Sequence, residues 1–294
     1  MYKINYSILL FSLLLISLNL HGQIVINEYS CGNVSNYPDN FSKYEDWIEI
    51  YNSSGSPVNI GGYYLSDRLN QPTKWMIPIG TSIGGNARMI FFASGKNTSS
   101  GAMHTNFRIT QTKFPSENIV LSDNTGTIID YITVSRTKED HSNARIPDGS
   151  TTWKVCTSPT PNLSNTGANT FLRYSASPVF NLLPGFDSGT QQIQITTSEP
   201  NSTIRFTTDG TEPTASSTPY IGPISISATS VLKAASFSSD PNITTGFVNF
   251  STYFINVSHS IPVVSIAANQ LTTLANWNGN LVPFGSFEYF NMNK

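Results

Sequence analysis

The stretch that decides the fold runs from residue 24 to residue 67 and reads IVINEYS at 24–30, DWIEIYN at 46–52 and VNIGGYYLSD at 58–67. Each run is rich in β-branched and aromatic residues, and Asn, Ser, Gly or Pro separates it from the next. Short runs of this kind, bounded by turn-forming residues, are typical of β-strands. The sequence therefore predicts three short strands joined by turns.

Similar runs continue as far as residue 162: KWMIP at 74–78, MIFFASGK at 89–96, RIPDGSTTWK at 145–154 and TSPTPN at 157–162. Together with the opening runs they resemble a lamin-tail domain, an immunoglobulin-like β-sandwich, over residues 23–160. The resemblance implies a scaffold or adhesion module rather than a catalyst. Within it, the runs 118–123 and 127–133 flank Asn-Thr-Gly and predict a hairpin. No segment shows a sustained helical period, so any helices are expected to be short.

A second all-β module is predicted over residues 187–257. The runs 192–197, 202–208, 224–228 and 230–237 alternate polar and apolar residues. Between them lies TDGTEPT at 208–214, in which Asp209-Gly210 predicts a turn, and TPYIGP follows at 218–223. These motifs resemble the C-terminal β-sandwich of chitobiases and β-hexosaminidases, which is an accessory to catalysis in those enzymes. Residues 161–186, rich in Pro, Ser and Asn, are predicted to be a linker.

Residues 258–294 resemble the opening of a CotH-type kinase-like domain. They predict a strand near 259–267, a short helical turn near 271–277 and a second strand near 286–290. The chain ends at Lys294, before the residues that such a kinase would use for ATP, metal or phosphoacceptor. The resemblance therefore implies a truncated CotH-family protein in which these residues are an incomplete stub.

The first 22 residues have the features of a secretory signal. Lys3 precedes an apolar stretch of about 13 residues, and Gly22 stands before Gln23. The stretch is short for a membrane span, so we expect cleavage before Gln23, with an uncleaved anchor as the alternative. The chain is thus predicted to be secreted or at the cell surface, with no membrane span after cleavage.

Composition agrees with export. Charged residues make up 12% of the chain, and the net charge is −2. Binding of nucleic acid requires clustered Lys and Arg, which the sequence lacks, so nucleic acid is excluded as an expected partner. The expected partner is instead an extracellular protein or polysaccharide of unknown identity.

Two cysteines, Cys31 and Cys156, follow the first and the last predicted strand of the lamin-tail-like region. In an oxidising compartment an even count permits a disulfide, and two separately buried thiols are the alternative. Two Cys without His at ligand spacing make no tetrahedral metal site. No metal and no cofactor is therefore predicted.

The sequence offers few candidates for catalysis. Asp46 and Glu49 are three residues apart in a predicted strand, so they point to opposite faces, and we expect a solvated turn Asp and an ion-paired or edge Glu. Asp209 and Glu212 are expected to belong to a turn rather than to a calcium site. The histidines are scattered and are expected to be isolated surface or edge residues: His104, His141 and His259. No catalytic residue is predicted.

Aromatic residues gather in the first module, and they permit two interpretations. Exposed, they would form a platform on which a sugar ring stacks; buried, they would belong to the core of the sandwich. The residues concerned are Trp47, Tyr51, Tyr63, Tyr64 and Trp75.

The sequence thus predicts an all-β chain of two tandem β-sandwiches with a short, incomplete C-terminal α/β stub. Its expected function is non-catalytic: exported modules that bind, space or present a catalytic domain at the cell surface. Two alternatives are open. In the first, the chain is the N-terminal part of a CotH-type phosphotransferase. In the second, it is a carbohydrate-binding accessory region of a glycan-degrading system.

Overall fold

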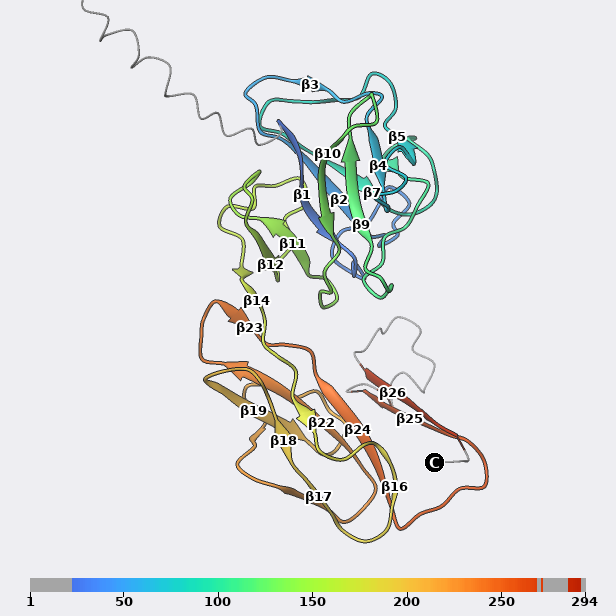
Figure 1. The fold of residues 1–294 in the computed structure, drawn as a ribbon, viewed down its shortest axis with the longest axis vertical. Helices are drawn as coiled ribbons and strands as arrows, with labels where there is room; N and C mark the ends of the chain where they lie inside the picture. The colour runs from blue at the N-terminus through green and yellow to red at the C-terminus, as the bar shows by residue number, and fades with distance from the viewer. Residues whose placement is uncertain (1–22, 269–270, 272–284, 292–294) are drawn as a thin grey trace, which may run out of the picture. The chain divides into compact units, whose positions relative to one another are not determined.

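A computed structural model describes residues 23–268, 271 and 285–291 and divides the chain into two compact units between Ala168 and Asn169. Apart from Leu271, whose backbone is helical, all regular structure of the described residues is β-strand, which confirms the predicted all-β class (Figure 1). No helix in this part of the chain is both long and apolar enough to cross a bilayer. The predicted signal, residues 1–22, lies outside the described residues.

The first unit contains a large sheet in which six of its strands follow the order β12-β11-β1-β2-β7-β8. Neighbouring strands pair antiparallel, except that β7 and β8 are parallel. The strands are β1 (Ile24–Ser30), β2 (Trp47–Asn52), β7 (Arg88–Phe92), β8 (Met103–His104), β11 (Ser142–Arg145) and β12 (Trp153–Cys156).

A second layer packs on one face of the large sheet. It has the order β10-β9-β4-β5, and a separate pair joins β3 to β6. The apolar core lies between the layers, with Ile48 and Ile50 from the large sheet and Leu65 and Leu121 from the smaller one. The strands are β3 (Val58–Asn59), β4 (Tyr64–Ser66), β5 (Trp75–Met76), β6 (Ser82–Ile83), β9 (Asn118–Ser122) and β10 (Ile128–Thr133).

The predicted hairpin is confirmed, because β9 and β10 pair antiparallel. The run 58–67 differs from the prediction, since it forms two short strands, β3 and β4. Gly61 and Gly62 interrupt it: Gly62 has a φ of +89°, and a Cβ on Gly61 would lie 2.7 Å from the backbone nitrogen of Gly80. The chain bends there in a way that only glycine accommodates easily.

The second unit is built on a sheet of order β16-β24-β22-β19-β20. Three short pairs surround it: β14 with β23, β15 with β18, and β17 with β21. Ile193, Leu232 and Tyr253 form part of its core. The strands are β13 (Thr170–Phe171), β14 (Arg173–Tyr174), β15 (Val179–Phe180), β16 (Gly185–Asp187), β17 (Gln191–Ile193), β18 (Ile195–Thr196), β19 (Ser202–Thr207), β20 (Thr218–Pro219), β21 (Ile224–Ile226), β22 (Ser230–Ser238), β23 (Ile243–Thr244) and β24 (Asn249–Ile255).

The predicted turn at Asp209 is confirmed. Its carboxylate accepts hydrogen bonds from the backbone N–H and the hydroxyl of Thr211, at 3.0 and 2.6 Å, and Gly210 has a φ of +80°. Glu212, beside this turn, pairs with the buried Lys233 at 2.6 Å. The structure thus gives both acidic residues a role in holding the loop.

Two strands follow in the predicted stub, β25 (Val263–Ala268) and β26 (Gly285–Phe290), and they pair antiparallel. Side chains attach the hairpin to the main sheet of the second unit, and two of these contacts are hydrogen bonds to backbone groups. Lys233 Nζ donates to the carbonyl of Ala267 at 3.3 Å, and Glu288 accepts from the backbone N–H of Thr252 at 2.7 Å. Apart from Leu271, the predicted helical turn lies outside the described residues.

The predicted linker, residues 161–186, is replaced by structure on both sides of the boundary between the units. Residues 173–174, 179–180 and 185–187 pair as β14, β15 and β16 with strands of the second unit. Strands of two or three residues leave no visible alternation, so the Pro-rich composition concealed them. Residues 160–166 lie against the first unit and belong to the site described next.

Candidate functional site

A β-bulge in β1 creates an unusual polar cluster on the large sheet. The pairing of β1 with β2 shifts between Ile26 and Glu28, so that Asn27 and Glu28 together oppose Glu49. Ile26 and Tyr29 face the core, which places Asn27 and Glu28 on the opposite face. All three polar side chains are fully buried. What buries them is a pair of loops that cross this outer face.

Glu28 receives hydrogen bonds from two elements. The hydroxyl of Ser142, on β11, donates to it at 2.5 Å. Thr160 donates twice, from its backbone N–H at 3.1 Å and from its hydroxyl at 2.9 Å. The carboxyl therefore joins a strand of the sheet to a loop that is more than a hundred residues away in the sequence.

Glu49 lies directly across from Glu28 in the strand register. It accepts from the side-chain amide of Asn27 at 2.9 Å and from the backbone N–H of Asn162 at 2.7 Å. Arg88, on β7, approaches its carboxyl to 3.9 Å. Two buried carboxyls are thus neighbours across two paired strands.

Asp148, in the loop between β11 and β12, is the third acid of the cluster. Arg88 pairs with it at 2.6 Å, and the amide of Asn27 donates to it at 2.8 Å. The hydroxyl of Ser164 and the backbone N–H of Asn165 donate to it at 2.5 and 3.2 Å. The fully buried Asn165 also donates to the carbonyl of Arg145 at 3.0 Å.

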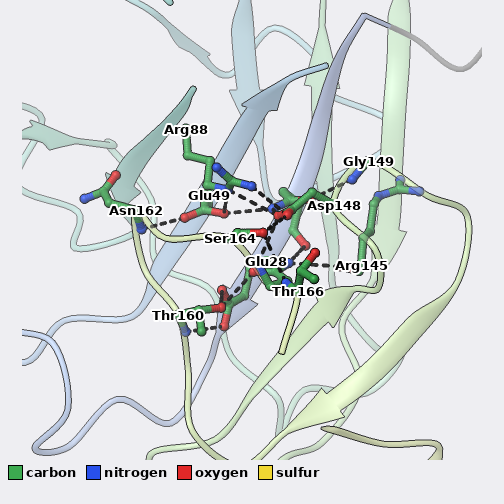
Figure 2. Close-up of polar contacts among 12 residues, drawn as sticks. Glu28, Glu49, Arg88, Arg145, Asp148, Gly149, Thr160, Asn162, Ser164 and Thr166 are labelled. Carbon is green, nitrogen blue, oxygen red and sulfur yellow. Dashed lines mark hydrogen bonds and ion pairs between the residues drawn. The ribbon is translucent and has the colours of Figure 1, made fainter. Parts of the chain in front are cut away.

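Residues 160–166, named the strap here, therefore lie over the three acids. Figure 2 shows that Thr160, the backbone nitrogen of Asn162 and Ser164 contact Glu28, Glu49 and Asp148 from one continuous segment. Backbone N–H groups outside regular structure need an acceptor, and here carboxylates supply it. The sheet and the strap are joined by side chains rather than by a strand ladder.

Burial sets the electrostatics of the acidic pair. Desolvation raises the pKa of Glu49 to about 8, the charge of Glu28 adds to the effect, and the bonds from Asn27 and Asn162 oppose it. Desolvation likewise raises the pKa of Glu28, against the bonds from Ser142 and Thr160. For Asp148, desolvation is outweighed by the bonds from Arg88, Ser164 and Asn27, so its pKa is lowered.

Perturbed acids of this kind are candidates for catalysis, but structural networks also produce them. A general acid or base must reach the proton that it transfers. Here the three carboxyls face donors of the protein itself, beneath the strap. Among the described residues, no group of three or more His, Cys, Asp or Glu side chains is placed to hold a metal ion.

The sequence prediction gave two alternatives for Glu49, an ion-paired or an edge residue, and the structure bears out the first. Asp46 accepts from the backbone N–H of Asn33 at 3.3 Å, and burial raises its pKa to about 6. Glu49 is ion-paired, as one alternative had it, but it is a fully buried residue of a central strand and not an edge residue. Glu28, Asp148 and the strap were not recognised from the sequence.

The histidines were expected to be surface or edge residues; His104 lies on the edge strand β8 but is not a surface residue. That ring is fully buried, with one nitrogen 2.9 Å from the hydroxyl of Ser94 and the other 2.8 Å from the side-chain oxygen of Asn40. His141 is half-buried, and desolvation lowers its pKa to about 4. His259 is exposed and packs edge-on to Phe186.

The aromatic residues do not form one exposed platform. Trp47 and Trp75 are buried, and Trp75 belongs to the main core of the first unit. Tyr63 and Tyr64 are half-buried, and Tyr63 packs against that core. Burial of both tryptophans corresponds to the core-packing interpretation, because a sugar can stack only on an accessible ring face.

The disulfide between Cys31 and Cys156 is not formed; both thiols are free and buried. Cys31 directly follows β1, Cys156 ends β12, and β11 lies between these two strands. Their α-carbons are therefore about two strand spacings, roughly 9–10 Å, apart, beyond the reach of a disulfide. Cys31 also belongs to the core, whereas Cys156 lies near Glu28 on the outer face.

We therefore expect both cysteines to react with iodoacetamide only after denaturation, because desolvation raises the pKa of each thiol and burial blocks access. Mass spectrometry of the native and the denatured protein would count the labels. Reduction should leave the melting temperature unchanged. A cross-linked peptide containing Cys31 and Cys156 in the non-reduced protein would contradict this expectation.

Comparison with protein families agrees with the two units. Residues 19–136 match the family model of the Lamin Tail Domain, and residues 183–246 match that of the chitobiase/beta-hexosaminidase C-terminal domain. No curated protein matches the chain. The first matched range ends before β11, β12 and the strap. The two strands nevertheless belong to the large sheet of the first unit. Two successive segments of the chain are thus similar to a Lamin Tail Domain and to a chitobiase/beta-hexosaminidase C-terminal domain.

Proposed function

We propose that the two units are exported, non-catalytic binding modules whose partner is an extracellular protein or polysaccharide. The observation that carries the proposal is the state of the best candidate acids. Glu28, Glu49 and Asp148 are occupied by hydrogen bonds from Thr160, Asn162 and other groups of the chain, so they hold the fold together. The matches to two accessory-type domains support the same reading.

A carbohydrate partner is a more specific form of this proposal. It is favoured by the match of residues 183–246 to a domain named after chitobiases and hexosaminidases. That argument is an analogy between domains and needs a direct test.

Three measurements on residues 23–294 test the proposal. With ATP and magnesium, or with aryl-glycosides, we expect rates equal to those of buffer. If the partner is a polysaccharide, we expect insoluble chitin or cellulose to retain the protein. If neither retains it, a protein partner is favoured. Turnover that a single carboxylate substitution abolishes would refute the non-catalytic function, and phosphate transfer from ATP would favour the CotH-type alternative.

A further inference from the structure

The strap depends on acidic side chains for its backbone hydrogen bonds. Three of its N–H groups, those of Thr160, Asn162 and Asn165, donate to Glu28, Glu49 and Asp148. Thr160, Asn162 and Ser164 are only half-buried or exposed, so little apolar packing holds the strap. Its attachment therefore rests on these carboxyls, together with the buried side chain of Asn165, which donates to the carbonyl of Arg145.

Glu28 and Glu49 are a directly opposed pair across β1 and β2. Side chains in that arrangement have their β-carbons about 4.5–5.5 Å apart, and like charges there repel. Both carboxyls are fully buried, so water does not screen the repulsion. The arrangement is tolerated most easily when one of the two carboxyls carries a proton.

The charged groups around the pair do not neutralise it. Arg88, on β7, is shared: it lies 3.9 Å from Glu49 but 2.6 Å from Asp148. The strap itself contains no Lys or Arg. Among the described residues, the three carboxyls of Glu28, Glu49 and Asp148 thus have a single close guanidinium between them, that of Arg88.

The other neighbouring strands supply no free cation nearby. Arg145, on β11, makes a two-fold contact with Asp130, at 3.0 and 2.9 Å. On β12, Cys156 lies close to Glu28 and is a neutral thiol, since burial raises its pKa to about 11. Lys154 shares the face of Glu28 in the register but lies two strands away, beyond Ala144.

We propose that the Glu28–Glu49 pair is a pH-sensitive clasp for the strap. While one carboxyl of the pair is protonated, residues 160–166 stay on the outer face of the large sheet; when both are ionised, repulsion across the strands releases the strap. The strap ends just before the boundary between the units at Ala168 and Asn169.

Hydrogen exchange of residues 23–294, followed by mass spectrometry, tests the clasp. After correction for intrinsic exchange, protection of peptides covering 160–166 should fall about tenfold or more between about pH 6 and about pH 9, since one pKa unit corresponds to a factor of ten. In E49Q, the protection should be independent of pH over that interval. E28Q provides a second variant, because Gln at 49 turns one oxygen into a donor that faces Asn27.

E117Q is the matched control. Glu117 is also a buried acid that accepts from the backbone of a loop, through Thr110 at 2.8 Å, but its neighbour is Lys113 rather than another acid. E117Q should therefore behave like the wild type at the strap. The proposal would be overturned if protection of the strap in the wild type did not change with pH. It would also be overturned if E49Q and E28Q lost as much protection as the wild type. If neither variant folds, the wild type alone decides. Loss of protection at high pH that is confined to residues 160–166 supports the clasp, and an equal loss at residues 110–117 overturns it.

Discussion

Replacing Glu49 with Gln is expected to remove a decline in the stability of the first unit that the wild type shows as the pH rises. Desolvation beside Glu28 raises the pKa of Glu49 from 4.5 to about 8 in the folded protein. Between these values the folded chain holds a proton that the unfolded chain has lost. Folding is therefore favoured less as the pH rises through this window, by a total on the order of 4 kcal/mol.

Below about pH 4.5 both states bind the proton, so the E49Q and wild-type proteins should differ least there. Above about pH 8 neither state does, so the variant should have its full advantage in stability over the wild type. Urea denaturation at several pH values measures this. Tryptophan fluorescence reports mainly the first unit, which contains Trp47, Trp75 and Trp153. A pH dependence that is identical in E49Q would show that Glu49 is ionised in the folded protein throughout.

The strands of the sandwich were predictable because their residues obey a local rule. In β2, Ile48 and Ile50 alternate with Glu49, and this pattern alone places the two isoleucines in the core. The hairpin of β9 and β10 and the turn at Asp209 were predictable for the same reason, since their signals lie within a few residues of sequence.

The candidate site escaped prediction because its bonds connect distant residues. Thr160 contacts Glu28 and Asn162 contacts Glu49, more than a hundred residues away, and no local pattern marks such pairs. The bulge did leave a trace: Ile26 and Tyr29 both face the core although they are three residues apart, which a regular strand forbids. That change of phase in IVINEYS places Asn27 and Glu28 together on the outer face, but the pairing of Glu28 with Glu49 also depends on the register of β2.

Composition was misleading where Pro, Ser and Asn are frequent. In the strap these residues led to the prediction of an extended linker, but its polar groups are suited to a covering segment that donates hydrogen bonds to carboxyl groups. Asn165 shows the difference, because it is fully buried and donates to the carbonyl of Arg145. Stability in this part of the fold comes from hydrogen bonds to buried carboxyl groups, which single-residue propensities do not describe.

Replacing Trp75 with Ala is expected to destabilise the first unit by about 3–5 kcal/mol, the usual result of removing a large buried aromatic side chain. Trp75 is 6% exposed, and its ring meets that of Phe91 edge-on at 6.0 Å. Its indole N–H also donates to the side-chain oxygen of Asn97 at 3.0 Å, so the substitution leaves that oxygen without its partner as well as a cavity.

The adjacent residue of β5 provides the control, because Met76 is 47% exposed. M76A should change the stability by less than about 0.5 kcal/mol, as is usual for a surface substitution. Urea denaturation of both variants separates the two interpretations of the aromatic cluster. If Trp75 were a sugar platform, W75A would lose retention on a polysaccharide and keep the stability of the wild type. If Trp75 is part of the core, W75A lowers the free energy of unfolding. M76A, at the next position of the same strand, leaves it almost unchanged.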